Sequence, residues 1–345
     1  MGNYFFYIFR YIWLLLNTVI NRYNDYVNKF IIQESKKKKS LSVISELNPW
    51  FITGFVDAEG CFFVSVCRRY KYRVGYQVQA FFQISLHDKD FELLSKIQIY
   101  FGVGLIKKHG DNSIYFRITS LRSLKKVITY FDKYQLITQK QGDYELFKQI
   151  LDLMKNKKHL TIEGLKEILR IKASMNLGLT ESLKIVFPYI SHKVRPKVVD
   201  NNIKDHNWVT GFTSGEGCFF VYVVRSTSTK LGETVRLKFQ ITQHIRDSEL
   251  MKKLITLFQC GRIESISNKL WLNFVVTNFK DITERIIPFF DKCPIQGVKA
   301  LDFLYFKKVA SLMENKAHLT KEGICEIRFI KSKMNKGSSS LGDLI

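Results

Sequence analysis

The residues of this 345-residue chain that could do chemistry are two glutamates, each near the end of the same short motif. The two copies of the motif span residues 52–60 and 209–217, and the acids are Glu59 and Glu216. In both copies small residues lie four positions apart, Gly54 with Ala58 and Gly211 with Gly215. That spacing lets two helix backbones pack closely. Packing the motif helices on each other would bring the two carboxylates together at the helix ends.

Two carboxylates that converge in this way repel each other unless a cation lies between them. Mg²⁺ binds through one or two carboxylates together with waters and phosphate oxygens. Such an ion could activate a water molecule and stabilise the leaving oxygen in phosphodiester cleavage. A single glutamate at a helix end is more typical of a solvated or capping side chain. Its repetition in a duplicated motif favours a catalytic role.

The motifs belong to an internal repeat that covers most of the chain. Thr53-Gly54-Phe55 recurs 157 residues later, whereas Phe131-Asp132-Lys133 recurs 159 residues later. The second copy therefore carries two extra residues, which we expect in loops. A repeat unit this long indicates a duplicated domain with a pseudo-two-fold axis. We divide the chain into an N-terminal hydrophobic and basic extension (1–46), a first domain (47–176), a linker (177–206), a second domain (207–337) and a tail (338–345).

Each copy is predicted to combine helices with an antiparallel sheet, which gives an α+β fold. Asn48-Pro49 supplies a cap and a first-turn proline for the motif helix. Period-two alternation then predicts a hairpin, and amphipathic patterns predict helices. In the first copy the later strands are expected at about 75–86, 103–109 and 113–119, and helices at 88–101, 121–133, 140–155 and 161–176.

The charge balance predicts a polyanionic partner. The chain has 54 Lys+Arg against 31 Asp+Glu and a net charge of +23, which favours nucleic acid and, less often, an anionic membrane. One face of each predicted sheet is polar and nearly free of acids. Its side chains are Arg69, Gln77, Gln79, Gln83, Ser85, Tyr115, Arg117 and Thr119 in the first copy, and Tyr222, Ser226, Thr234, Arg236, Lys238, Gln240, Thr242 and Asn273 in the second. Glutamine and arginine can bond base edges in pairs, and an antiparallel ribbon can enter the major groove.

Three further features concern the N-terminal extension and the location of the protein. Residues 4–20 are almost wholly apolar, and three interpretations stay open: a membrane-associated helix, an organelle targeting segment, or a remnant of an upstream reading frame. The lysine run 36–39 predicts a solvated linker. The six cysteines are scattered and lack zinc-site spacing, which predicts reduced thiols and an intracellular compartment.

With its two motifs and their separation, the chain resembles the LAGLIDADG homing endonucleases, most of all the single-chain branch encoded in fungal mitochondrial introns. The resemblance covers about residues 47–337. It implies two pseudo-symmetric domains, each with an αββαββα core whose sheet forms a DNA-binding saddle. It also implies a mitochondrial monomer without a small-molecule cofactor that makes double-strand breaks in a long DNA site, leaves short 3′ overhangs and promotes intron mobility.

The resemblance also implies individual roles. Glu59 and Glu216 are the family's acids, and the backbone carbonyls of Ala58 and Gly215 are metal ligands for two or more Mg²⁺ ions. A glutamine that orders water falls on Gln243, where the first copy has Leu86. The basic residues near the scissile phosphates fall on Lys140 and Lys299, and a surface lysine at a helix start is the alternative for both. Asp57 aligns with Ser214, so it is not expected to be an essential ligand.

Two other functions stay open from the sequence. Members of this family also act as maturases, which bind the host intron RNA and assist its splicing. A third interpretation is a membrane-tethered DNA-binding protein without catalysis, and it depends only on the apolar run at residues 4–20. The presence of both glutamates favours the nuclease, since a protein that acted only in splicing need not keep them.

Overall fold

The computed structural model describes residues 47–198, 202–265 and 269–334. We refer to 47–198 as half one and to 202–334 as half two. The apolar run at 4–20 and the lysine run at 36–39 lie outside the described residues, so their interpretations stay open. Within the described ranges, no helix combines the length and apolar character that crossing a membrane requires.

Half one contains a four-stranded antiparallel sheet with strand order β1-β2-β4-β3. The sheet begins directly after the first motif helix, as the sequence predicts. The elements of half one are α2 (Pro49–Glu59), β1 (Gly60–Arg68), β2 (Tyr76–His87), the 3₁₀ turn η1 (Asp88–Asp90), α3 (Phe91–Phe101), β3 (Leu105–Lys108), β4 (Ser113–Ile118), α4 (Leu121–Lys133), α5 (Lys140–Lys155), η2 (Lys158–Leu160), α6 (Ile162–Ala173) and α7 (Glu181–Val186).

Half two repeats this order, with strands β5-β6-β8-β7 in its sheet. Its elements are α8 (His206–Glu216), β5 (Gly217–Arg225), β6 (Glu233–His244), η3 (Ile245–Asp247), α9 (Ser248–Phe258), β7 (Arg262–Ser265), β8 (Trp271–Val276), α10 (Phe279–Asp281), the π-helical turn η4 (Ile282–Ile286), α11 (Ile287–Lys292), α12 (Lys299–Glu314), η5 (Ala317–Leu319) and α13 (Lys321–Lys331). The α+β class and the duplication predicted from the sequence are confirmed.

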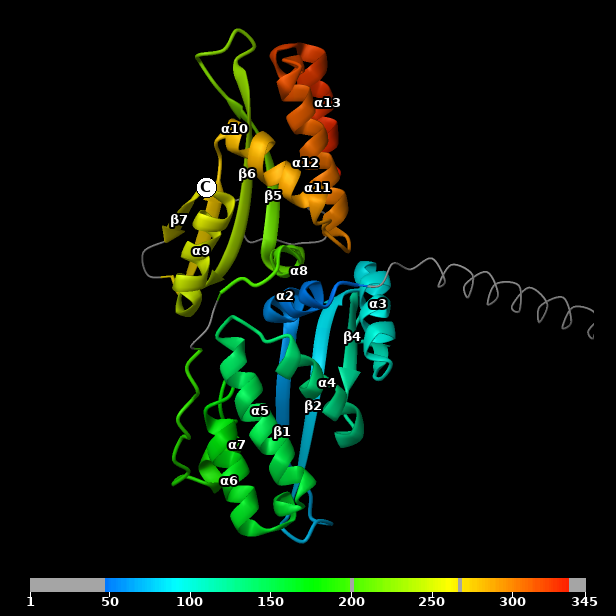
Figure 1. The fold of residues 1–345 in the computed structure, drawn as a ribbon, viewed down its shortest axis with the longest axis vertical. Helices are drawn as coiled ribbons and strands as arrows, with labels where there is room; N and C mark the ends of the chain where they lie inside the picture. The colour runs from blue at the N-terminus through cyan, green and yellow to red at the C-terminus, as the bar shows by residue number, and fades with distance from the viewer. Residues whose placement is uncertain (1–46, 199–201, 266–268, 335–345) are drawn as a thin grey trace, which may run out of the picture. The chain divides into compact units, whose positions relative to one another are not determined.

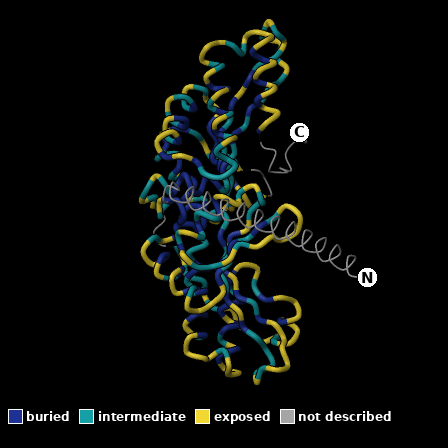
Figure 2. The backbone as a smooth tube through the Cα atoms, turned by 90° about the vertical axis from the view of Figure 1, so that its right-hand side faces the viewer, coloured by how far each residue is buried: buried dark blue, intermediate teal, exposed yellow. Residues whose placement is uncertain are grey.

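The motif helices α2 and α8 lie side by side where the two sheets meet (Figure 1). Each helix has a side-chain N-cap: Asn48 accepts the N–H of Trp50 at 2.8 Å, and Asp205 accepts the N–H of Asn207 at 2.7 Å. Buried backbone runs through this junction, and exposed backbone is concentrated at the far ends of the two halves (Figure 2). The central residues of both helices, Phe51–Asp57 and Trp208–Ser214, are therefore buried inside the fold.

The two extra residues of half two are not both in loops, which corrects the sequence prediction. One residue is added in the loop between β7 and β8. The last residues of β3 and β7, Lys108 and Ser265, are 157 positions apart, whereas the first residues of β4 and β8, Ser113 and Trp271, are 158 apart. The second is added inside a helix. The cap Ser120 of α4 corresponds to Asn278, but its last residue Lys133 corresponds to Lys292. A single inserted residue widens one turn of a helix into a π-helical turn, and η4 occupies that position.

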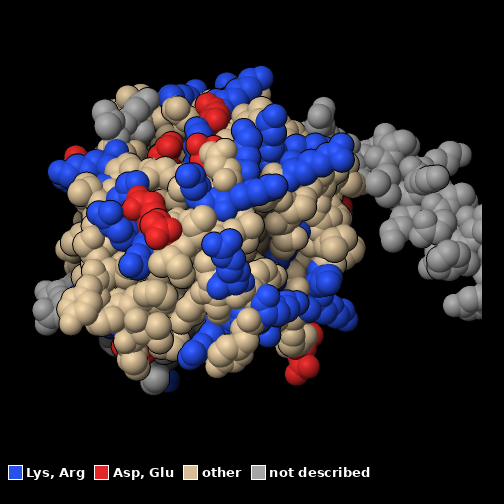
Figure 3. All heavy atoms as spheres, turned by 90° about the horizontal axis from the view of Figure 1, so that it is seen from below, with Lys and Arg blue, Asp and Glu red and all other residues tan. Residues whose placement is uncertain are grey.

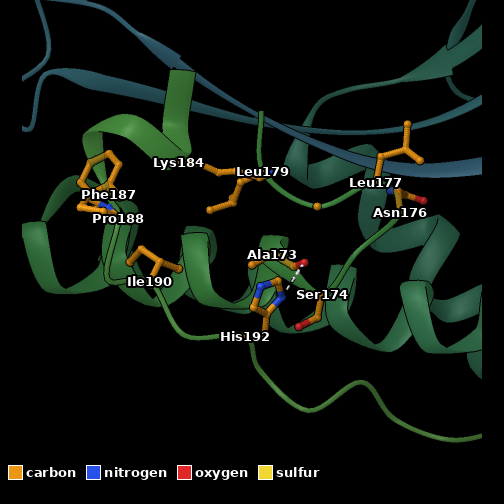
Figure 4. A pocket seen from close by; sticks show the side chains of 11 residues that line it. Ala173, Ser174, Asn176, Leu177, Leu179, Lys184, Phe187, Pro188, Ile190 and His192 are labelled. Atoms are coloured by element: carbon orange, nitrogen blue, oxygen red, sulfur yellow. Dashed lines mark hydrogen bonds between the residues drawn. The ribbon is translucent and has the colours of Figure 1, made fainter. Parts of the chain in front are cut away.

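The segment predicted as a linker contains a short helix, α7, which the sequence analysis did not predict. Together with the end of α6 it borders a pocket of ≈ 540 Å³ (Figure 4). His192, which lines this pocket, ties the segment to the end of α6, because its Nδ1 lies 3.1 Å from the carbonyl oxygen of Ala173. The exact limits of the two domains, the linker and the tail remain predictions.

Candidate active site

The close approach of α2 and α8 depends on one glycine in each helix. A Cβ at Gly54 would lie 1.9 Å from the carbonyl oxygen of Trp208, and a Cβ at Gly211 would lie 1.9 Å from that of Phe51. A Cβ at Gly215 would similarly lie only 2.4 Å from the Cβ of Ala58. Only glycine leaves room for backbone at these distances, so the small-residue spacing seen in the sequence produces the predicted contact.

This packing brings the two motif carboxylates to the same place. Beside Gly215 lies the carboxylate of Glu59, because a Cβ on that glycine would be 3.3 Å from Glu59 Oε1. Burial, and then the charge of Glu59, raise the pKa of Glu216 to about 7. Burial also raises the pKa of Glu59, and the nearby Lys299 opposes that rise. Two half-buried acids that lie close enough for the charge of Glu59 to raise the pKa of Glu216 form a site suited to a cation.

The two predicted lysines lie at this site as well. Lys140 is the first residue of α5, and its Nζ donates to the carbonyls of Val56 at 2.8 Å and Ala58 at 3.0 Å. Lys299 is the first residue of α12, and its Nζ donates to the carbonyl of Gly215 at 2.5 Å. Burial lowers the pKa of both lysines, while the motif acids oppose that fall. Neither lysine is the solvated surface side chain that the sequence left as the alternative.

The donor atoms suit a hard divalent cation. Glu59 and Gly215 border one cleft of ≈ 660 Å³, which Lys299 and Asp90 also line, so the site offers carboxylate and backbone oxygens as ligands. Such all-oxygen sets are typical of Mg²⁺ and Ca²⁺ sites. A carbonyl oxygen has two lone pairs, so it can accept a lysine bond and still bind a metal. In the described ranges no cluster of three or more His, Cys, Asp or Glu side chains could hold an ion, so the fit depends on shared carboxylates and backbone.

Asp57 serves the scaffold, as its mismatch with Ser214 suggested. It is buried and accepts from Ile137 N–H at 3.1 Å, from the Thr138 backbone and hydroxyl, and from Trp208 Nε1 at 2.8 Å. Burial nevertheless raises the pKa of Asp57 to about 6. The carboxylate thus joins three segments: the motif helix α2, the approach to Lys140, and α8 of the other half.

The predicted polar face of half one is present. In β2 the side chains alternate between buried Val78, Ala80, Phe82 and Ile84 and the exposed or half-buried glutamines. Strand register places Gln83 opposite Arg117 and Ser85 opposite Tyr115. Arg117 donates to Gln83 at 2.6 Å and lies over the Phe81 and Tyr115 rings at 4.4 and 4.3 Å. Gln77 and Gln79 pair with β1, whereas Arg69 and Thr119 lie one residue beyond the ends of β1 and β4.

Half two presents the corresponding face with different chemistry. Gln240 donates to Thr242 at 3.0 Å and to Asn273 at 3.2 Å, and Thr242 donates to Asn273 at 2.8 Å. Lys238 lies over the Phe220 ring at 4.6 Å and the Tyr222 ring at 5.5 Å. The remaining predicted residues follow the same strands: Arg236 opposite Tyr222, Thr234 opposite Val224, and Ser226 one residue beyond β5. These networks hold the polar groups in fixed directions on each sheet.

Positive charge is widespread at the surface. In Figure 3, lysine and arginine side chains spread across the face shown, and acidic side chains occur in only a few places. This distribution agrees with the net charge of +23. A surface of this kind attracts a phosphate backbone at a distance.

Gln243 lies next to the end of β6, opposite Leu272, and its Oε1 accepts the backbone N–H of His244 at 2.7 Å. Leu86, its counterpart in half one, lines the same cleft as Glu59. The two halves therefore carry different side chains at this equivalent position. The water-ordering role of Gln243 remains a prediction.

Sequence reasoning missed several residues that support the site. The carboxylate of Asp143 in α5 accepts two bonds from Arg195, at 2.7 and 2.8 Å, and the same guanidinium donates to the Gln139 carbonyl at 2.6 Å. Arg195 lies in the predicted linker, far from α5 in sequence, so nothing in the local pattern indicated it. Asp90 and Asp247 were also missed, although they recur with the repeat spacing of 157 residues.

Comparison with known proteins identifies the family. The LAGLIDADG endonuclease family model matches residues 52–151 and 209–310, one segment in each half. The chain belongs to the LAGLIDADG endonuclease family. Among curated proteins it is 44% identical over 312 residues to probable intron-encoded endonuclease 2 of Neurospora crassa, spanning 86% of this chain and 67% of that protein. Probable intron-encoded endonuclease 3 of the same fungus is 41% identical, across 86% of this chain and 56% of its own length.

A third relative is an uncharacterised protein in ND4 intron 1 of Podospora anserina, 51% identical over 120 residues, which are 34% of this chain and 27% of that protein.

Solved structures agree in fold. The I-SmaMI LAGLIDADG homing endonuclease bound to cleaved DNA matches with a TM-score of 0.83 and 46% identity, covering 85% of this chain and 98% of that one. I-SmaMI bound to an uncleaved DNA target in the presence of calcium ions matches with a TM-score of 0.83 and 47% identity, over 84% and 100%.

Proposed function

We propose that this LAGLIDADG protein is a site-specific, Mg²⁺-dependent homing endonuclease that cuts both strands of a long DNA target. The observation that carries the proposal is the meeting of Glu59 and Glu216 at the junction of two polar, acid-poor sheets. Each sheet would contact one half of the target, and the cuts would leave short 3′ overhangs. Cleavage at the intron-free allele would promote movement of the host intron.

Residues of both halves would contribute to each cut. Glu59 and Glu216, with the carbonyls of Ala58 and Gly215, are the oxygens that would hold two or more Mg²⁺ ions. When bound, these ions would polarise the phosphate and a water molecule. The ammonium groups of Lys140 and Lys299 lie within bonding distance of these carbonyls, where a fixed positive charge stabilises charge developing on a phosphate. Gln243 would orient a water molecule on the side of half two only.

The proposed setting is a mitochondrion, in line with the ND4 intron relative. We propose a monomer with internal pseudo-two-fold symmetry and no small-molecule cofactor, because both copies of the motif lie in one chain. Two of the curated relatives are named probable intron-encoded endonucleases, and the two I-SmaMI structures are bound to DNA. The alternative of an RNA maturase is therefore not favoured.

Removing the divalent ion is expected to abolish cleavage without abolishing DNA binding. The test uses a duplex that joins the two exons flanking the host intron, in molar excess over the protein. Cleavage is compared with Mg²⁺ present, with Mg²⁺ replaced by Ca²⁺, and with EDTA. Cutting is expected with Mg²⁺ alone, since Ca²⁺ accepts a looser ligand geometry and activates water less. Binding measured by fluorescence anisotropy should persist, and its affinity should fall steeply with salt.

A duplex of the same length and base composition but scrambled sequence is the matched control. Cutting in EDTA at the rate seen with Mg²⁺ would refute the metal requirement. Equal cutting of the scrambled duplex would refute site specificity.

A further inference from the structure

Two acids that the proposed mechanism does not use hold the helices that begin with the site lysines. Asp90 in half one accepts the N–H of Val298 at 2.8 Å, directly before Lys299. Asp247 in half two accepts the N–H of Gln139 at 2.7 Å, directly before Lys140. Both contacts cross from one half to the other, and both use Oδ1. The arrangement is reciprocal, as the duplication would require if both contacts serve the same purpose.

These contacts lie at helix ends whose own N-cap side chains make no capping bond. Gln139 and Val298 are the N-cap residues of α5 and α12, and neither has a side-chain capping bond. A carboxylate at a helix N-terminus accepts an otherwise unpaired N–H and also interacts favourably with the helix dipole. Each half thus accepts the N–H of the N-cap residue of the other half's helix.

The fold delivers both acids rigidly. Each follows the long second strand of its sheet by one 3₁₀ turn, η1 or η3, and each turn starts with a histidine cap: His87 accepts the N–H of Lys89, and His244 accepts the N–H of Arg246. Asp247 is buried, and Asp90 is half-buried in the cleft that also contains Glu59 and Lys299. On the opposite side Gly297, at φ +73°, leaves room for the acid, since a Cβ there would be 2.4 Å from Asp90 Oδ1, closer than atoms can approach.

We propose that Asp90 and Asp247 are positioning residues, each of which sets the place of the lysine that acts in the other half. Lys299 depends on Asp90, and Lys140 depends on Asp247. This inference rests on the proposed endonuclease function. As a consequence, cleavage of each DNA strand requires a contact between the two halves. If one half is displaced, the lysine of the other half loses its support.

The test is strand-resolved cleavage under single-turnover conditions, on a duplex whose two strands carry different labels. Lys299→Ala and Lys140→Ala first show which strand each lysine serves. Asp90→Ala is then expected to slow the Lys299 strand about tenfold, and Asp247→Ala the Lys140 strand by a similar factor, with the other strand within about twofold of wild type. Nicked product should accumulate in both variants.

Asp90→Asn and Asp247→Asn are the matched controls, because an amide oxygen can still accept the N–H. They are expected to recover cutting to within about threefold of wild type. Slowing of both strands equally by Asp90→Ala, or slowing of the strand that Lys140→Ala affects, would overturn the inference, as would unchanged rates in both alanine variants. If wild type itself does not cut the duplex, the proposed function fails instead, and the two failures are thereby distinguished.

Discussion

A Glu216→Gln variant is expected to cut no detectable DNA and yet to unfold less readily than wild type in metal-free buffer at pH 8. Loss of one oxygen ligand and its charge from the proposed site is expected to slow cleavage by at least about 10³-fold. The gain in stability has a separate cause. The glutamine retains the shape of the side chain but removes the repulsion that Glu59 exerts on Glu216.

The pH dependence of unfolding tests whether the gain in stability comes from relief of the repulsion between Glu59 and Glu216. Because burial and Glu59 raise the pKa of Glu216 from 4.5 to about 7, the folded state binds more protons than the unfolded state between these two values. The free energy of unfolding therefore contains a favourable contribution below pH 4.5, which is lost as the pH rises to 7. The upper bound on that loss is about 3 kcal/mol.

Urea unfolding of both proteins in EDTA at pH 5 and pH 8 measures this effect. Glu216→Gln should be the more stable protein at pH 8 by about 1–3 kcal/mol, with little difference at pH 5. Mg²⁺ should stabilise wild type and have a smaller effect on the variant. Equal stabilities at pH 8, or a variant that still cuts at the wild-type rate, would contradict the proposed pairing of the acids.

Gly54→Ala is expected to lower the free energy of unfolding by more than about 4 kcal/mol, among the largest effects of a single methyl group. The added Cβ would lie 1.9 Å from the Trp208 carbonyl oxygen, and backbone cannot rotate away as a side chain can. The helices α2 and α8 would have to separate, which would disrupt packing across the junction. Gly211→Ala should behave alike, since its Cβ would meet the Phe51 carbonyl at the same distance.

Gly75→Ala is the matched control for this substitution. Nothing lies within 4 Å of a Cβ at Gly75, but its φ of +74° disfavours alanine, so a loss of only about 1–2 kcal/mol is expected. Chemical denaturation with a spectroscopic readout compares the three variants. If Gly54→Ala and Gly75→Ala are equally stable, the helices do not pack as closely as the structure shows.

Features carried by a periodic or repeated pattern could be predicted from the sequence. The duplication, the contact of the motif helices and the polar sheet faces each follow from residue spacing alone, because small residues permit close packing and alternation sets which face a strand side chain occupies. Residue spacing did not place Lys140 and Lys299, which were predicted only through the family resemblance. Their contacts with Ala58 and Gly215 depend on how α5 and α12 pack beside the motif helices.

The remaining features depend on distant pairings that no local pattern encodes. Asp57 was not expected to be an essential ligand, but nothing in the sequence indicated that its carboxylate accepts from Thr138 and Trp208, which are distant in sequence. The extra residue inside a helix of half two could not be separated from a loop insertion, since both give the same change of offset. Asp90 and Asp247 shared the repeat spacing, so comparison of acids between the copies would have found them.

Mapping the cut positions on both strands of the joined-exon duplex tests the central claim most directly. The products of wild-type protein with Mg²⁺ are resolved on a denaturing gel, with each strand labelled separately. Two paired acids between two sheets should give one cut in each strand, at positions offset by a few nucleotides that leave 3′ overhangs. Cuts confined to one strand, or an intact duplex under conditions where the protein binds it, would contradict the assignment of Glu59 and Glu216 to a double-strand endonuclease.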